Sequence, residues 1–213
     1  MNVLVVVGHP DDEALGCGGT IAKLADAANH VTALLVTRRC DPRGREHWPD
    51  LLDAFGKSCE LLGARAAMLE ELLDETLAES HVNVLHDRVL PWVERADLVL
   101  THWYGDVNQV HRGVSRAVEI ATRPFRRRRD VSCFEVPTST DQGFGGTGLA
   151  FQPTEYVVLD ASHTRRKCAA VAQYDSEIAA GRTPDDVERS LRSRGSSIGA
   201  EFAEAFVVAR RFR

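Results

Sequence analysis

The feature that most constrains the fold is an uninterrupted apolar run at the start of the chain, residues 3–7. A strand that is apolar at every position is buried on both of its faces, which is typical of parallel sheets covered by helices. A similar run at 31–37 follows a segment, 21–28, whose apolar residues recur at helical spacing. The beginning of the chain therefore predicts a β-α-β unit that is covered on both sides.

The same alternation continues to the end of the chain. Further strands are predicted at residues 66–69, 97–101, 131–136 and 156–159. Further helices are predicted at residues 50–62, 85–93, 110–121 and 165–177. The last segment also predicts helix, because apolar residues recur there at helical intervals around a break at Gly195; they are Val187, Leu191, Ile198, Phe202 and Phe206.

This alternation predicts an α/β fold, a Rossmann-like doubly wound and mostly parallel sheet with helices on both faces, in a single domain of residues 1–213. Functional residues are then expected beyond the carboxyl ends of the strands. The net charge of −5 does not favour a nucleic-acid partner, and the arginine run at 126–129 is interpreted as a solvated connection. Five cysteines without C-x-x-C spacing, no signal peptide and no membrane span predict a cytoplasmic protein, with homo-oligomerisation left open.

A histidine and three consecutive acids follow the first strand, in "GHPDDEALGCGGT". The glycines after them do not complete a dinucleotide-binding G-x-G-x-x-G pattern, because position 21 is Ile21, and the acids would repel a pyrophosphate. A metal site fits better. His9 and Asp12 are three residues apart and can face one point in a tight turn, and a divalent cation would offset the repulsion among the acids.

A catalytic zinc site needs about three protein ligands, so one more ligand is missing from this stretch. Of the remaining histidines, only His102 and His111 lie near the end of a predicted strand, in "THWYGDVNQVHRGV". One of these two is therefore the candidate for the third ligand. A phosphoesterase with two metal ions is not favoured, because only one set of three ligands is present.

These motifs resemble a known family, the zinc-dependent N-acetylglucosaminyl deacetylases that include the phosphatidylinositol-linked and LmbE-like enzymes. "GHPDDE" is similar to the family's A-H-P-D-D-E, and "NQVH" at 108–111 to its H-x-D-H; "FEVPTST", "FQPTEYVVL" and "QYDSE" resemble the sugar-deacetylase branch. The resemblance implies His9, Asp12 and His111 as ligands of Zn²⁺ or Fe²⁺, with Asp11 as general base. It implies an N-deacetylase, an amidohydrolase acting on a linear amide of a small N-acyl amino sugar or sugar conjugate.

The sequence departs from the family pattern at three positions: Gly8, Asn108 and Val110 replace alanine, histidine and aspartate. The family histidine is thought to stabilise the oxyanion; the amide of Asn108 can donate a hydrogen bond there but cannot deliver a proton. His102 is a candidate for that donor or acid, or a structural residue. These departures leave an alternative function open. The protein could be a relative with a degenerate active site that binds a sugar or nucleotide-sugar without hydrolysing it.

Three further residues are candidates for substrate binding, each with a structural alternative. Arg39 follows the second strand and could meet a phosphate or carboxylate, or remain solvated. Trp103 could stack on a sugar face, or pack in the interior. Asp106 could accept a substrate hydroxyl, support a metal ligand, or form a turn.

Overall fold

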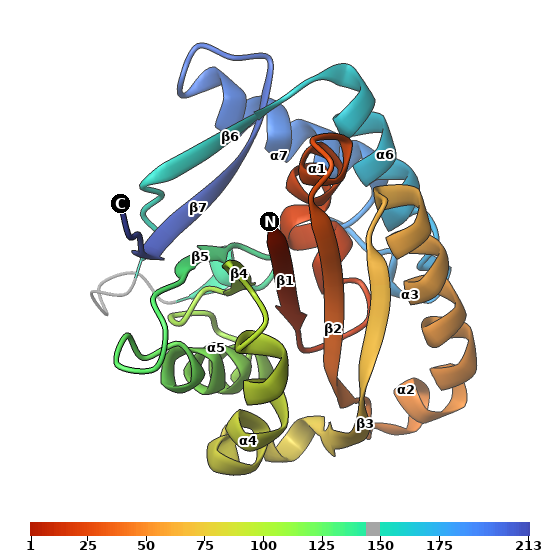
Figure 1. The fold of residues 1–213 in the computed structure, drawn as a ribbon. Helices are drawn as coiled ribbons and strands as arrows, with labels where there is room; N and C mark the ends of the chain where they lie inside the picture. Colours follow the sequence, from red (N-terminus) through yellow and green to blue (C-terminus); the bar gives the residue numbers. More distant parts are fainter. Residues whose placement is uncertain (144–149) are drawn as a thin grey trace.

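The computed structural model describes residues 1–143 and 150–213, except for the side chain of Arg43. Within these residues the strands form one sheet of seven, in the order β3-β2-β1-β4-β5-β7-β6 (Figure 1). The strands are β1 (Asn2–Val7), β2 (His30–Arg38), β3 (Arg65–Asp74), β4 (Leu98–His102), β5 (Asp130–Phe134), β6 (Glu155–Leu159) and β7 (Phe202–Arg210). The first five strands of this order are mutually parallel, and β7 runs antiparallel to both of its neighbours, β5 and β6. The predicted α/β fold with a mostly parallel sheet is confirmed.

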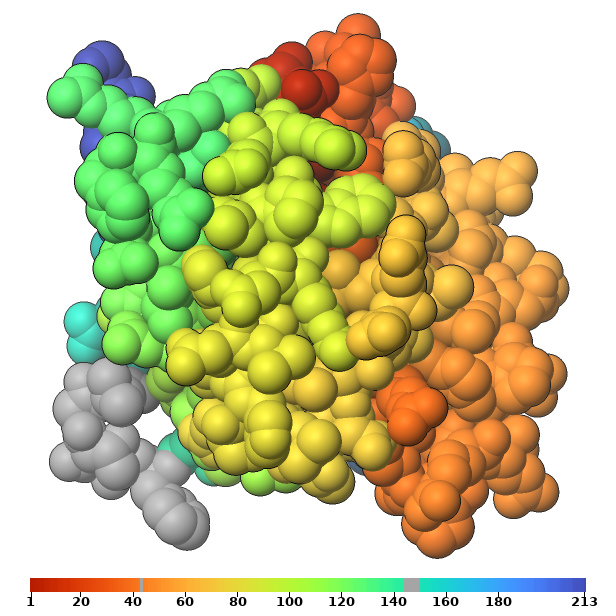
Figure 2. All heavy atoms as spheres, turned by 60° about the horizontal axis from the view of Figure 1, so that its bottom comes forward, coloured from red at the N-terminus to blue at the C-terminus, as the bar shows by residue number. Residues whose placement is uncertain are grey.

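Helices cover both faces of the sheet. The helices are α1 (Asp12–Asp26), α2 (Pro42–Glu46), α3 (Trp48–Leu62), α4 (Val82–Val93), α5 (Gln109–Ala121), α6 (Ala161–Val171) and α7 (Pro184–Ser196). Apolar residues of α1, α3, α6 and α7 form one core with the sheet, and those of α4 and α5 form the other. In Figure 2, α4 and the segment before it, in yellow, form the middle of the surface between α5 in green and α2 and α3 in orange.

Short 3₁₀ turns connect several of these elements, at Glu75–Leu77, Thr140–Gln142 and Asp175–Glu177. Among the described residues, no helix is both long and apolar enough to cross a bilayer. The predicted glycine-rich loop at 143–148 lies largely outside the described residues.

The prediction of helix at the end of the chain is wrong beyond residue 196. There the chain turns at Gly199, whose φ is 75°, and returns as strand β7. Phe202 and Phe206 are four residues apart, a spacing that places side chains on one face of a helix and equally on one face of a strand. Helix α6 is also shorter than predicted, because it ends at Val171.

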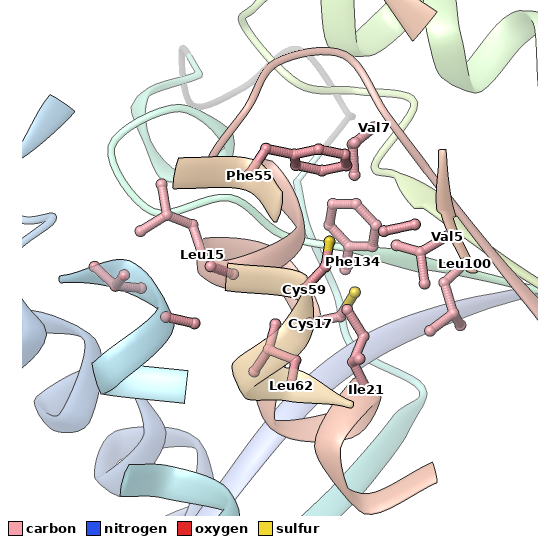
Figure 3. Close-up of a cluster of buried hydrophobic side chains, with 14 of the residues drawn as sticks. Val5, Val7, Leu15, Cys17, Ile21, Phe55, Cys59, Leu62, Leu100 and Phe134 are labelled. Carbon is pink, nitrogen blue, oxygen red and sulfur yellow. The ribbon is translucent and has the colours of Figure 1, made fainter. Parts of the chain in front are cut away.

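The glycine-rich stretch after the acids brings α1 close to the sheet. A Cβ at Gly16 would lie 2.3 Å from the ring of Phe134, and one at Gly19 would lie 2.3 Å from Leu159. In Figure 3, Cys17 and Ile21 of α1 pack beside Phe134 in the core. These glycines therefore serve close packing.

Helix α1 is broken at Cys17, whose φ of −141° and ψ of 25° are not helical. A buried ion pair from distant parts of the chain supplies the hydrogen bonds that the break removes. Glu204 of β7 accepts from the backbone N–H groups of Gly19 and Thr20, at 2.9 and 2.7 Å. Lys167 of α6 donates to the carbonyl of Leu15 at 2.8 Å and to Glu204 at 2.6 Å. The pair holds the two halves of α1 in place.

Candidate metal centre and catalytic site

Three side chains from separate elements meet at the carboxyl ends of β1 and β4. His9 follows β1, Asp12 begins α1, and His111 lies in the first turn of α5. One potential ligand atom of each lies within 4.8 Å of the others. Asp12 is central: its Oδ2 is 3.3 Å from Nδ1 of His9, and its Oδ1 is 3.2 Å from Nε2 of His111. The predicted set of three residues is therefore brought together.

Each of the two imidazoles has a second carboxylate at its other ring nitrogen. Nε2 of His9 lies 3.3 Å from Oε2 of Glu75, and Nδ1 of His111 lies 3.2 Å from Oδ2 of Asp106. Such a carboxylate fixes the orientation of a metal-binding histidine and selects its tautomer. The arrangement leaves Nδ1 of His9 and Nε2 of His111 on the side of Asp12.

The charges in the cluster also suit a cation. Burial alone lowers the pKa of His9, but hydrogen bonds with Asp12 and Glu75 outweigh it and raise the pKa to about 10. Burial raises the pKa of Asp12, but the neighbouring His111 and His102 hold it well below its usual range. Among the described residues, Nε2 of the buried His111 has no hydrogen-bond partner of good geometry. Two imidazoles and one carboxylate with such an unpaired nitrogen fit a divalent metal ion.

His102 lies behind the cluster, completely buried. Its ring stacks on that of His111, with centroids 4.0 Å apart and planes 6° apart. Its Nε2 accepts a hydrogen bond from the N–H of Gly8 at 3.0 Å, which requires that this nitrogen carry no proton. Burial, together with the charge of His111, lowers the pKa of His102 to about 3. This environment does not favour the acid role considered from the sequence.

Asp106 supports His111 from a buried position. Its Oδ1 accepts from Ser139 at 2.5 Å and from the N–H of Asn108 at 2.7 Å, while its Oδ2 accepts from Thr140 at 2.5 Å. Burial raises the pKa of Asp106, but its contacts with His111, Ser139 and Thr140 bring it down to about 2. The carboxylate is thus occupied within the protein, which does not favour direct binding of a substrate hydroxyl.

Asn108 and Val110 flank the start of α5. Asn108 is the N-cap: its Oδ1 accepts from the N–H of Val110 at 2.8 Å, so its amide NH₂ is the part of the side chain left to donate elsewhere. Val110 is buried against Gly8, where an added Cβ would lie only 2.8 Å from its Cγ1. The departures at positions 8 and 110 therefore fit one another, since the glycine makes room for the valine.

Asp11 is held in an unusual backbone conformation, with a φ of 111°. Its Oδ2 lies 3.4 Å from Nη1 of Arg182, a residue 171 positions later in the chain. Burial and the charge of Asp12 raise the pKa of Asp11 well above its usual value, and the charge of Arg182 opposes this rise. A carboxylate beside the metal cluster but outside its ligand set is the arrangement expected of a base.

Glu13 connects this turn to the rest of the molecule. It is completely buried and accepts from the N–H of Asp11 at 3.3 Å, from Ser58 at 2.5 Å and from Tyr174 at 2.6 Å. Burial raises its pKa to about 7, against the effect of the two hydroxyl hydrogen bonds. Glu13 thereby fixes the turn against α3 and the segment after α6.

Arg39 and Trp103, the remaining candidates for substrate binding, have different surroundings. Arg39 lies near the site but contacts acids, with Nη1 3.2 Å from Glu177 and Nε 3.6 Å from Glu75. Trp103 is only 4 % exposed and packs against Tyr104 and Phe151, so its burial does not favour stacking on a sugar. Tyr104, which is 48 % exposed, presents the accessible ring in this region.

Sequence reasoning did not single out Glu75, Arg182 or Tyr174. Glu75 had a usable signal, because it directly follows a strand, β3, at the same edge of the sheet. Tyr174 lies within "QYDSE", which resembles the family, but the resemblance gave this residue no role. Arg182 had no signal, since it lies in the connection between α6 and α7 and reaches the site only through the fold.

Comparison with known proteins identifies one protein family that the sequence matches. The sequence matches the family of the GlcNAc-PI de-N-acetylase, PIG-L, over residues 4–122. Over 61 residues it is 41 % identical to a 1D-myo-inositol 2-acetamido-2-deoxy-alpha-D-glucopyranoside deacetylase of Salinispora arenicola. That stretch makes up 29 % of this chain and 19 % of the relative.

Solved structures share the fold at low identity. N,N'-diacetylchitobiose deacetylase of Pyrococcus horikoshii superposes with a TM-score of 0.70 at 18 % identity, covering 97 % of this chain and 83 % of that one. GalB, the 4-carboxy-2-hydroxymuconate hydratase of Pseudomonas putida, superposes with a TM-score of 0.71 at 16 % identity, covering 100 % and 97 %. The fold thus occurs with two different reactions. The family match spans more than half of the sequence and contains all three clustered residues, and the chain belongs to the GlcNAc-PI de-N-acetylase family.

Proposed function

We propose that this protein is a metal-dependent hydrolase that removes the N-acetyl group from an amino sugar or a sugar conjugate. The observation that carries the proposal is the buried cluster of His9, Asp12 and His111 with Asp11 beside it, in a chain that belongs to a de-N-acetylase family. The hydratase with the same fold shows that the fold alone does not define the reaction.

His9, Asp12 and His111 would hold the metal ion, which we propose to be Zn²⁺, with Fe²⁺ as the alternative that the same ligands suit. When bound, such an ion acidifies the attacking water and polarises the acyl carbonyl. Glu75 and Asp106 hold the two imidazoles in the orientation that binding requires.

The remaining chemistry belongs to groups of the protein. Asp11 accepts one proton from the water that attacks the acyl carbon and returns it to the sugar nitrogen as the C–N bond breaks. The second proton of the water leaves with the carboxyl group and passes to the amine, so the products are acetate and the ammonium form of the sugar. The amide NH₂ of Asn108 donates a hydrogen bond to the acyl oxygen in the transition state. His102 keeps Gly8 and the ring of His111 in position and transfers no proton.

The substrate is a small N-acetylated sugar, of the kind named for the deacetylases of Salinispora arenicola and Pyrococcus horikoshii. We place Arg39 in the wall of the substrate region, where Glu75 and Glu177 neutralise its charge. A cytoplasmic location and the lack of a nucleic-acid partner remain predictions, as does the oligomeric state.

The decisive test is acetate release. Protein loaded with zinc is incubated with N-acetylglucosamine conjugates, including N,N'-diacetylchitobiose and the acetamido-deoxyglucosyl inositol, and acetate is measured. The wild-type protein should release acetate, and Asp11→Ala should abolish release while the bound zinc remains. Asp53→Ala, a change at an exposed residue of α3, should leave the rate unchanged.

One observation favours a second candidate function. Val110 stands where the family motif has an aspartate, so the site lacks a polar pair that relatives possess. A protein that binds the same sugars without hydrolysing them would show saturable binding by calorimetry and no acetate from any member of the panel. That outcome would replace the hydrolase proposal.

A further inference from the structure

The two adjacent acids of the site have different partners. Asp12 lies among three imidazoles, those of His9, His102 and His111, at 3.2 to 3.4 Å. Asp11 has a side chain that is only 6 % exposed, and among the described residues one cationic group, the guanidinium of Arg182, contacts it. Arg182 has no place in the motifs that identify the site.

Two nitrogens of the Arg182 guanidinium have contacts within the protein. Its Nε donates to Oγ1 of Thr138 at 2.5 Å, and its Nη1 lies 3.4 Å from Oδ2 of Asp11. A quarter of the side chain is exposed. Because Thr138 anchors Nε, the planar guanidinium presents Nη1 to the Asp11 carboxylate from a fixed direction.

The backbone around Arg182 is built to bring it there. Gly181 has a φ of 86°, and its N–H donates to Oδ2 of Asp186 at 3.0 Å. A Cβ at position 181 would lie 2.4 Å from Cγ2 of Thr138, which itself has a φ of 63°. Gly181 thus packs directly against the side-chain methyl group of Thr138, and this close approach places Arg182 beside Asp11.

We propose that Arg182 is a positioning residue for Asp11: it holds the carboxylate of the base at the edge of the metal cluster and transfers no proton itself. The inference rests on the proposed hydrolase function. It adds a part of the site that lies outside the matched family region, residues 4–122. Loss of the guanidinium would leave the Asp11 carboxylate present but misplaced. A misplaced base lowers the rate of turnover more than it lowers the affinity for substrate.

The test compares two variants. Arg182→Met removes both the positive charge and the planar guanidinium, whereas Arg182→Lys keeps the charge alone. Zinc-loaded proteins are assayed on the panel substrate that the wild type hydrolyses fastest. We expect kcat of Arg182→Met to fall about 100-fold with little change in KM and no loss of bound zinc. Arg182→Lys should have an intermediate kcat, and added guanidinium ion should restore part of the activity of Arg182→Met. Arg116→Met, at an exposed arginine of α5, should match the wild type.

A second pair of variants displaces Arg182 without changing it. Gly181→Ala places a Cβ against Thr138, whereas Gly199→Ala has the same kind of positive φ, 75°, but open space around it. Gly181→Ala should reproduce the loss of kcat, and Gly199→Ala should lose stability only.

Two results would overturn the inference: a rise in KM with kcat unchanged in Arg182→Met, which would make the residue a substrate ligand, or an unchanged kcat. Crystal structures of the zinc-loaded wild type and Arg182→Met separate this inference from the proposed function. If no substrate is hydrolysed, the proposed function fails, yet displacement of the Asp11 carboxylate in the variant would still support the positioning role. An unmoved carboxylate would refute that role.

Discussion

The protein buries charge in two places, and the two clusters differ in how that charge is compensated. At the break in α1, Lys167 and Glu204 neutralise each other, and their hydrogen bonds go to one another or to backbone groups of the broken helix. At the ends of β1 and β4, acids and imidazoles lie together, and among the described residues the ring nitrogens of His111 contact Asp12 and Asp106 without good hydrogen-bond geometry. The first cluster is complete within the chain, whereas the second is arranged for something that the chain does not contain. We therefore interpret the first cluster as structural and the second as a set of donors for a metal ion.

The largest effect should come from breaking the complete cluster. Lys167→Met leaves Glu204 buried without its counter-charge and removes the hydrogen bond to Leu15. We expect a loss of about 3–5 kcal/mol in the free energy of unfolding, measured by urea denaturation. Lys57→Met removes an exposed partner of Asp53 and should cost less than about 1 kcal/mol. Equal losses in the two variants would contradict the assignment of Lys167 and Glu204 as a structural cluster.

The incomplete cluster should respond to metal instead. Zinc at 100 times its dissociation constant should raise the free energy of unfolding by about 2.7 kcal/mol, because it binds only the folded chain. Asp12→Asn, which removes the central carboxylate, should abolish this rise, whereas Lys167→Met should retain it. A zinc response that survives in Asp12→Asn would place the metal elsewhere.

The packing behind the metal cluster can be tested with Gly8 and Val110. Gly8→Ala forces a methyl group against Val110 and should lower the free energy of unfolding by about 1–3 kcal/mol. The double variant with Val110→Ala should recover most of this loss, since the methyl then has room. If thermal unfolding shows no recovery, the two departures from the family motif are independent of each other.

An effect on metal affinity rather than on stability is expected at the outer carboxylate of His9. Glu75→Gln keeps the size of the side chain but weakens the contact that orients the imidazole, so zinc affinity should fall about 10- to 100-fold. Competition with a fluorescent chelator measures the affinity. Glu71→Gln, at the exposed partner of Arg88, is the matched control and should bind zinc like the wild type.

The parts of the molecule that sequence reasoning could predict are those governed by local patterns. The buried strand β1, the turn after it and the pair His9 and Asp12 follow from an apolar run and from short spacing. Strand ends left His102 and His111 as alternatives for the third member, and the family resemblance chose His111. The contact between Asp11 and Arg182 could not be predicted, because it joins residues 171 positions apart through a turn with no motif. Lys167 gave no signal either, since a lysine on a helix is normally exposed. Strand β7 was misassigned because a spacing of four residues suits both kinds of secondary structure.

The antiparallel return of β7 has a consequence for synthesis of the chain. The ribosome makes the three clustered residues within the first 111 positions, but the carboxylate that caps the second half of α1 belongs to residue 204. A nascent chain therefore contains all three proposed metal ligands before it contains Glu204, the residue that stabilises the second half of α1. We therefore expect stable metal loading only after β7 has joined the sheet, and a fragment that ends at residue 122 should contain the family motif without a working centre.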